Sequence, residues 1–417
     1  MRDRRNRSTV IRIIAIIVSV AAIAGIAAVL YFGDLIKIPA QKESAQTETE
    51  TETVSPSEIS HDAEPLDTVF FVSDYQIMPG WDTPAENLTA ILRAVKKAGK
   101  EPTNVVFCGD YTNDSRLSDY ELSPDASIQE IKNIIASECS SVSEKDLIFE
   151  QGNHDQLTDA ITPTGLYEYE NYYVYVLNTQ YDFPWTQGKK TEYRDRVIQA
   201  AENLKTSLNG LIDAGETRPV FIAGHVPLHF TAKTSSRFTT GDNMYSSYIF
   251  DAVNSCAEFL DIIYFTGHNH SKGWDCYMGG SCIFKVPGDT ILIPDAGGHS
   301  RNTDSFNEKT LNFTYMNAGY VGFYINCSPK DFRNGNSGNY RAADETLTGT
   351  VCEILPTELV LSRYSPEGIH PLCGDGDGNP YRGNIDASLI SENYYSMKRE
   401  SPVHIERKAL ISKIQIF

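Results

Sequence analysis

Five short apolar runs, each followed at once by polar side chains, constrain the fold of this chain more than any other feature. The runs stand in TVFFVSDYQ, NVVFCGDYTND, DLIFEQGNHD, PVFIAGHVPLH and IIYFTGHNH. Apolar, β-prone runs of about four to six residues bounded by glycine are typical of buried strands. The polar residues that follow them are Asp74, Gln76, Asp110, Asn153, His154, Asp155, His225, His268 and His270.

Helical patterns lie between these runs. In PAENLTAILRAVKKAGK, the apolar residues Leu88, Ile91, Leu92 and Val95 follow the spacing of an amphipathic helix, and a glycine follows. Similar patterns occur in DASIQEIKNIIAS, RVIQAAENLKTSLNGLIDAG and SSYIFDAVNSCAEFL. Strands that alternate with helices predict an α/β domain, in which the loops at the carboxyl ends of the strands line the binding crevice. We therefore expect the five polar clusters to converge at one edge.

The converging side chains predict a metal centre. Carboxylates, amides and imidazoles that were buried together without a cation would be poorly paired and costly to bury. A donor set of oxygen and nitrogen without cysteine suits Mn, Fe or Zn. The set is too large for one tetrahedral ion and suits two divalent ions that share a carboxylate. Such a pair activates water for the hydrolysis of a phosphoester.

The same residues resemble the motif pattern of the calcineurin-like metallophosphoesterase superfamily, which is DxH, GDxx(D/N), GNH(D/E), HxP and GHxH. Here the motifs read DYQ, GDYTN, GNHD, GHVP and GHNH, in the family's order. The resemblance implies a four-layer α/β/β/α sandwich built on two mixed sheets. It also implies a phosphoric ester hydrolase in which a metal-activated hydroxide attacks the phosphorus.

The resemblance further implies a role for each residue. The ligands of one metal would be Asp74, Gln76 and His270. The ligands of the other metal would be Asn153, His225 and His268. Asp110 would bridge the two ions. His154 would act beside the leaving group as general acid or as stabiliser of the transition state, and Asp155 would orient it.

Two details of the motifs leave alternatives. His229 is a second candidate for the ligand position of His225, although the HxP spacing favours His225. Gln76 stands where most members of the family have histidine, and because an amide oxygen is a harder, weaker donor than imidazole, Mn is the favoured ion. Branches of the family that act on nucleotide-like diesters and pyrophosphates look similar at this position. We therefore expect a small phosphorylated substrate, a monoester or a diester, with extracellular nucleotides as the first candidates and phospholipid or teichoic-type headgroups as the second.

The N-terminus predicts a membrane anchor. Residues 1–12 are basic, and residues 13–32 are almost wholly apolar, which is long enough to cross a bilayer. Because arginines before the run favour keeping that end in the cytoplasm, we expect a single-pass protein of a bacterial cell membrane with an extracellular catalytic domain. A cleaved signal peptide is the alternative.

Composition completes the predicted organisation. Residues 33–65 read as a flexible acidic stalk, residues 66–365 as the metallophosphoesterase domain, and residues 366–417 as an extension packed on that domain. The net charge of −19 argues against a nucleic-acid partner. No particular protein partner is indicated. The alternative function is a non-catalytic metal-binding interaction module that keeps the fold.

Three smaller features carry predictions of their own. Cys276 and Cys282 are the most plausible local disulfide, whereas Cys108 lies within an apolar run and is expected to be a buried thiol. The tyrosine-rich run at residues 167–180 is expected to be a core strand, with base stacking by one tyrosine as the alternative. Asp375 to Asp386 has partial calcium-loop spacing, but Pro380 occupies the position that requires glycine, so a surface loop is favoured.

Overall fold

The computed structural model describes residues 63–76, 83–112, 124–178, 190–228, 245–268, 284–294, 306–322, 347–372 and 401–409. Its α-helices are α2 (Thr83–Lys97), α3 (Pro124–Glu138), α4 (Lys190–Asp213) and α5 (Ser247–Cys256). A short 3-10 helix, Glu144–Asp146, precedes β3. Within the described ranges, no helix combines the length and the apolar character needed to span a membrane.

The larger sheet has eight strands in the described part of the chain. They are β1 (Asp67–Val72), β2 (Asn104–Cys108), β3 (Leu147–Glu150), β12 (Gly319–Tyr320), β13 (Thr348–Ile354), β14 (Glu358–Ser365), β15 (Gly368–His370) and β16 (Val403–Glu406). The main path runs β15-β14-β13-β1-β2-β3, with β12 beside β13 and β16 beside β14. The sheet is mixed, because β1, β2 and β3 are parallel whereas β13 is antiparallel to both β1 and β14.

The second sheet has six strands within the same ranges, in the order β4-β5-β6-β7-β11-β8. They are β4 (Gly165–Glu168), β5 (Tyr173–Val176), β6 (Val220–Ala223), β7 (Ile262–Thr266), β8 (Phe284–Lys285) and β11 (Thr314–Asn317). Strands β5, β6, β7 and β11 are parallel, and β4 and β8 pair antiparallel at the two edges. A separate antiparallel pair joins β9 (Thr290–Pro294) and β10 (Phe306–Thr310).

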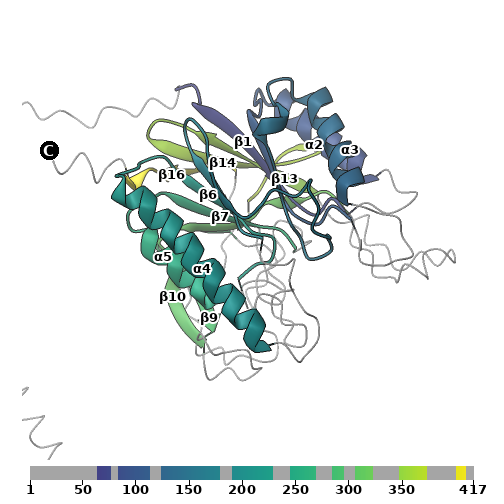
Figure 1. Cartoon of the computed structure of the whole chain (residues 1–417). Coiled ribbons are helices and arrows are strands. Elements are labelled where there is room, and N and C mark those ends of the chain that lie inside the picture. Colours follow the sequence, from purple (N-terminus) through teal and green to yellow (C-terminus); the bar gives the residue numbers. More distant parts are fainter. Residues whose placement is uncertain are drawn as a thin grey trace, which may run out of the picture. The chain divides into compact units, whose positions relative to one another are not determined.

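Three hydrophobic cores arrange these elements in layers. The central core lies between the two sheets and joins side chains such as Phe71 of β1 to Phe265 of β7, whose rings stack 3.7 Å apart. A second core packs α2 and α3 on the outer face of the larger sheet, and a third packs α4 and α5 on the outer face of the other sheet (Figure 1). Apolar side chains on both faces of the central strands explain why these strands read as continuous apolar runs.

The structure confirms the predicted alternation of strands and helices in a mixed α/β fold. All five apolar runs form strands, and all four amphipathic patterns form helices. The tyrosine-rich run contains β5, in which Tyr173 and Tyr175 pack in one core while Val174 packs in another. Cys108 is fully buried with a free thiol, as predicted.

Several predictions fall on residues outside the described ranges. These are the anchor at residues 13–32, the stalk, His229, His270, the Cys276 and Cys282 pair, and the loop from Asp375 to Asp386. Part of the C-terminal extension is described, and its β16 pairs along β14 of the larger sheet.

Candidate metal centre

The predicted site residues lie just beyond the carboxyl ends of five strands. Asp74 and Gln76 follow β1, Asp110 follows β2, and Asn153 follows β3. His225 and His268 each stand two positions after the last residue of β6 and β7. Because β1 to β3 are parallel in one sheet and β6 and β7 are parallel in the other, all five ends meet at the same edge of the two stacked sheets.

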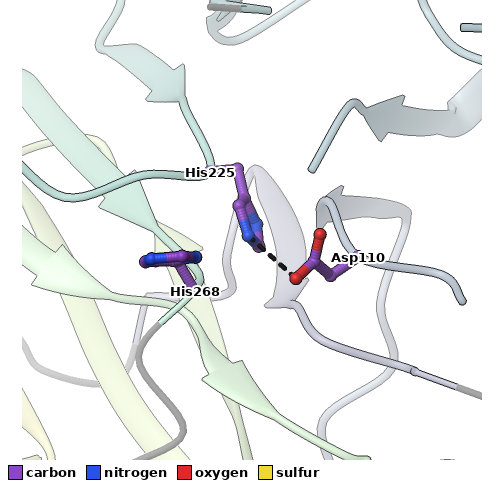
Figure 2. A group of neighbouring side chains, drawn as sticks. All are labelled: Asp110, His225 and His268. Atoms are coloured by element: carbon purple, nitrogen blue, oxygen red, sulfur yellow. Dashed lines mark ion pairs between the residues drawn. The ribbon is translucent and has the colours of Figure 1, made fainter. Parts of the chain in front are cut away.

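Asp110, His225 and His268 form the centre of the cluster. Their potential ligand atoms all lie within 4.8 Å of one another, and Figure 2 shows the three side chains as neighbours, with a dashed line for the ion pair between His225 and Asp110. The Nε2 atom of His225 lies 3.2 Å from Oδ2 of Asp110. The amide oxygen of Asn153 lies 2.6 Å from Nδ1 of His268 and 3.2 Å from Nε2 of His225. The donors of four strand ends are therefore in mutual contact.

A hydrogen bond to the main chain orients the ring of His225. Its Nδ1 lies 2.6 Å from the carbonyl oxygen of Cys108, and since a carbonyl only accepts, Nδ1 is the donor. Nε2 is thereby left facing Asp110, which is the usual arrangement of a metal-binding histidine. Burial lowers the pKa of His225, but the charge of Asp110 and the hydrogen bond to it outweigh burial and raise the pKa well above its usual value.

Asp110 is buried and receives hydrogen bonds at both oxygens. The main-chain N–H of His154 donates to Oδ1 over 2.8 Å, and the amide of Gln76 donates to Oδ2 over 3.2 Å. Burial alone would raise the pKa of this carboxyl, but the neighbouring imidazoles, His225 first, hold the pKa far below its usual range. The group is therefore a carboxylate, which is the state that a bridging ligand requires.

Asp74 is fixed by the turn that carries His268. The main-chain N–H of His268 donates to Oδ2 of Asp74 over 2.9 Å, and the hydroxyl of Ser73 donates to the same oxygen. The main-chain N–H of Asp74 donates to the carbonyl oxygen of Gly109 over 2.9 Å. The carbonyl oxygen of Asp74 in turn accepts the N–H of Gly322 over 2.7 Å. The strand ends at residues 74, 109 and 268 are thus hydrogen-bonded into one unit.

The side-chain oxygen of Gln76 indicates whether a cation fits this site. Its Oε1 atom is buried and has no hydrogen-bond partner among the described residues. A buried amide oxygen without a partner costs about 1–3 kcal/mol, so its position calls for a ligand. An oxygen from Gln76 beside a carboxylate and imidazoles is a donor set that Mn, Fe or Zn accepts. The residues present fit a divalent metal.

The main chain is strained where it presents these donors. Asp74, Gln76, Asp110 and His268 have positive φ angles of 54°, 44°, 59° and 64°. A side chain other than glycine rarely adopts this left-handed region, and each such residue costs on the order of 1–3 kcal/mol. Among the described residues only Tyr245 shares the feature without belonging to the predicted site. Strain concentrated in this way is typical of a functional site.

His154 and Asp155 differ from each other in their surroundings. The side chain of His154 is 28% exposed, and its Nε2 lies 4.0 Å from Asp110. Asp155 is buried, and its carboxylate accepts main-chain N–H groups of Asp110, Tyr111 and Gly152 over 2.8 to 2.9 Å. Burial first, and the charge of Asp110 second, raise the pKa of Asp155 to about 7.

The contacts of Asp155 go to the main chain. Its carboxylate accepts hydrogen bonds from two turns, whereas the orientation of the His154 imidazole by Asp155 stays a prediction. The physical reason is that these turns expose several N–H groups that no strand pairs, and a buried carboxylate satisfies them. Asp155 therefore fixes the turn that carries His154.

Sequence reasoning missed three polar residues around the centre. Ser73 contacts the Asp74 carboxylate. Asn317, at the end of β11, hydrogen-bonds to Gly267 and Gly319. Glu150 is fully buried, neither carboxylate oxygen has a hydrogen-bond partner in the described ranges, and burial raises its pKa well above normal. The run TYMNAGY carries the signal for Asn317, because it too is a strand followed by a polar residue and a glycine.

Comparisons with known proteins assign a family to part of the chain. Residues 67–272 match the family model described as calcineurin-like phosphoesterase. This part of the chain is therefore a calcineurin-like phosphoesterase domain, and the general class of the protein is a metal-dependent phosphoesterase. No curated protein gives a sequence match.

Solved structures that match this chain have low sequence identity to it and low TM-scores. A dimetal phosphatase from Danio rerio is 11% identical, with a TM-score of 0.42, over 74% of this chain and 98% of that one. A Vps29 mutant from Entamoeba histolytica is 12% identical, with a TM-score of 0.28, over 72% of this chain and 92% of that one.

Proposed function

We propose that this protein is a membrane-anchored, extracellular phosphoesterase with a dimetal centre, which hydrolyses a small phosphomonoester or phosphodiester of nucleotide-like chemistry. The observation that carries the proposal is the contact of buried and partly buried donors from separate strand ends around Asp110, together with Oε1 of Gln76, which has no hydrogen-bond partner among the described residues. The proposed anchor is the apolar run at residues 13–32, followed by an acidic stalk.

The donors divide into two proposed groups that share Asp110. The first group is Asp74, Gln76 and His270. The second group is Asn153, His225 and His268, whose side chains contact one another in the structure. Two divalent cations, with Mn favoured, would supply positive charge to the phosphate oxygens and lower the pKa of water. The net charge of −19 makes such local positive charge necessary for an anionic substrate.

His154 is the proposed catalytic residue. It is partly exposed at the edge of the cluster, and its main-chain N–H is fixed by Asp110, so its ring can reach a substrate that lies over the centre. A protonated imidazole in that place donates a proton to the departing oxygen or stabilises the charge that develops on it. Asp155 fixes the position of this turn through the main chain.

The test is hydrolysis by the full-length chain, purified in a mild detergent, stripped of metal and given Mn, Zn or Fe. A monoester, a diester and a nucleotide panel would be compared. We expect metal-dependent turnover and a loss of about a hundredfold to ten-thousandfold in kcat for His154→Ala, with bound metal retained, since this is the usual size of a general-acid contribution. His404→Ala is the matched control, because His404 is an exposed histidine that pairs with Glu358 on β14.

The competing function is a non-catalytic metal-binding interaction module with the same fold. Two bound ions per chain with no turnover on any ester, or equal turnover in His154→Ala and the wild type, would contradict the proposed enzyme. Membrane attachment is tested separately, because deletion of residues 1–32 should release the protein from the membrane fraction of cells that express it.

A further inference from the structure

A buried arginine connects the two sheets directly behind the candidate metal centre. Arg363 lies on β14, on the same face as Leu359 and Leu361, which pack in the core between the sheets. It is the largest of the fully buried side chains in the described residues, at 1% exposure. Its guanidinium donates to the main-chain carbonyl of Asn317, which ends β11 of the other sheet. An arginine in this core therefore has a partner next to the site.

Asn317, which accepts the hydrogen bond from Arg363, is itself hydrogen-bonded to the turn that carries His268. It pairs with Thr266 of β7, one residue before the glycine of the GHNH motif. Its Nδ2 donates to the carbonyl of Gly267 over 3.4 Å, and its Oδ1 accepts the N–H of Gly319 over 2.9 Å. One amide side chain thus joins the chain segments at residues 267 and 319.

Gly319 closes a ring of hydrogen bonds that includes Asp74. Its carbonyl accepts the main-chain N–H of Ser73 over 3.1 Å, and the hydroxyl oxygen of Ser73 lies 3.0 Å from the same carbonyl. The Ser73 hydroxyl also contacts the Asp74 carboxylate, which accepts the N–H of His268. Asp74 and His268 are therefore hydrogen-bonded to each other directly. Through Gly319 and Gly267, both are also connected to Asn317.

The linked donors are two of the residues with left-handed φ angles, 54° for Asp74 and 64° for His268. Such conformations persist only where the surrounding structure determines them. The ring through Asn317 is positioned to do so, because it holds the residue before each donor, Ser73 and Gly267.

We propose that Asn317 and Arg363 are positioning residues of the candidate metal centre: they hold the turns that present Asp74 and His268 to a divalent cation. The inference rests on the proposed function. Neither residue touches the metal, and both act through the main chain of neighbouring turns. Hydrogen-bonded residues behind a ligand typically change metal affinity by about tenfold to a hundredfold when they are replaced.

The experiment compares variants at these positions with matched variants at the opposite edge of the two sheets. Asn317→Ala is matched by Asn312→Ala, because Asn312 precedes β11 and its amide also donates to a main-chain carbonyl, that of Asn254. Arg363→Met is matched by Arg407→Met, because Arg407 is also buried and donates to the carbonyls of Leu355 and Thr217. The full-length chain in detergent is used throughout.

The measurements are Mn²⁺ affinity by equilibrium dialysis and the visible absorption of the Co²⁺-loaded protein, with thermal unfolding of the metal-free protein alongside. We expect Asn317→Ala and Arg363→Met to weaken Mn²⁺ binding about tenfold or more and to shift the Co²⁺ spectrum. The two controls should lower the unfolding temperature to a similar degree and leave both metal readouts unchanged. Arg363→Lys, which keeps a charged donor, should recover part of the affinity.

Two results would overturn the inference. If the wild type binds metal, and both Asn317→Ala and Arg363→Met bind it with the same affinity and the same Co²⁺ spectrum, the inference is overturned. The proposed function would then still stand. If the wild type binds no divalent metal, the proposed function fails, and the inference fails with it. If Arg363→Met does not fold, Arg363→Lys and Asn317→Asp decide, because wild-type metal binding in both of these folded variants would contradict a positioning role.

Discussion

The two ends of the central strands both bury charged and polar groups, but they do so differently. At the end where β6 and β7 begin, Asp261 accepts the N–H groups of Lys408 and Ala409, and Arg407 lies 4.0 Å from it. Arg407 also donates to three main-chain carbonyls. At the other end, Asp110, His225 and His268 gather with a buried amide oxygen that lacks a partner within the described ranges.

The difference separates a structural use of buried charge from a functional one. At the structural end an acid faces a base: Oδ2 of Asp261 and Nε of Arg407 have no hydrogen-bond partner among the described residues, but they lie 4.0 Å from each other and carry opposite charges. At the site end the acids and amides face imidazoles in strained turns, and the arrangement becomes well paired only with a cation. Burial alone does not distinguish the two ends, whereas the identity of the partners does.

The largest expected effect is that of Asp110→Asn. The variant removes the carboxylate on which both proposed ligand groups converge, so we expect a loss of bound metal and a fall in kcat/KM of at least about a thousandfold, equivalent to roughly 4 kcal/mol. Steady-state hydrolysis and elemental analysis of the bound metal provide the measurement.

The matched change at the opposite end is Asp261→Asn, which also replaces a buried aspartate by its amide. It should leave kcat/KM within about twofold of wild type, because Asp261 lies at the other ends of the strands. Equal losses of activity in the two variants would contradict the assignment of a functional role to one end and a structural role to the other. Full activity of Asp110→Asn would contradict it as well.

A smaller effect is expected from Gly267→Ala. A Cβ at this position would lie 2.5 Å from the Ser73 hydroxyl, 2.6 Å from the Cys108 carbonyl and 2.8 Å from Nδ1 of His225. Because a main-chain atom is among these neighbours, the turn must move, at a cost of about 1–3 kcal/mol in stability. We expect Mn²⁺ affinity to fall about tenfold as His268 shifts.

Gly210→Ala provides the control for that change. Gly210 lies within α4, a Cβ there meets nothing within 4 Å, and alanine favours the helix by up to about 1 kcal/mol. Urea unfolding and Mn²⁺ titration of both variants make the comparison. Unchanged Mn²⁺ affinity in Gly267→Ala would show that the close packing of this turn does not position the metal ligands.

The sequence predicted the strands, the helices and the residues that follow them, because apolar periodicity and the order of elements determine which chain ends meet. It did not predict how the donors are held. The left-handed angles at Asp74 and Asp110 depend on contacts between distant turns, and no local pattern records them. Arg363 and Arg407 each bond to segments far away in the sequence, so their partners become visible only in three dimensions. The main-chain N–H groups that Asp155 accepts also come from two turns that are separate in the sequence.

The smallest expected effect is a pH dependence at the structural end. Burial raises the pKa of Asp261 above its usual 3.8, although the N–H groups of Ala409 and Lys408 and the charge of Arg407 oppose the shift. The folded state therefore binds this proton more tightly than the unfolded state does. A carboxyl with a raised pKa stabilises the folded state while it is protonated, and that contribution is lost as pH rises through the folded pKa.

Asp261→Asn removes this titration and isolates its contribution. In urea unfolding of the metal-free protein, we expect the stability of the wild type relative to the variant to decrease as pH rises from about 4 to about 6. Metal-free conditions exclude the pH dependence of metal binding, and the titration of groups at the opposite end is common to both proteins and cancels in the difference. A difference between the two proteins that stays constant over this range, or grows with pH, would mean that the hydrogen bonds and Arg407 fully compensate the buried charge. The structural end would then be even more closely matched than its distances indicate, which would sharpen its contrast with the metal centre.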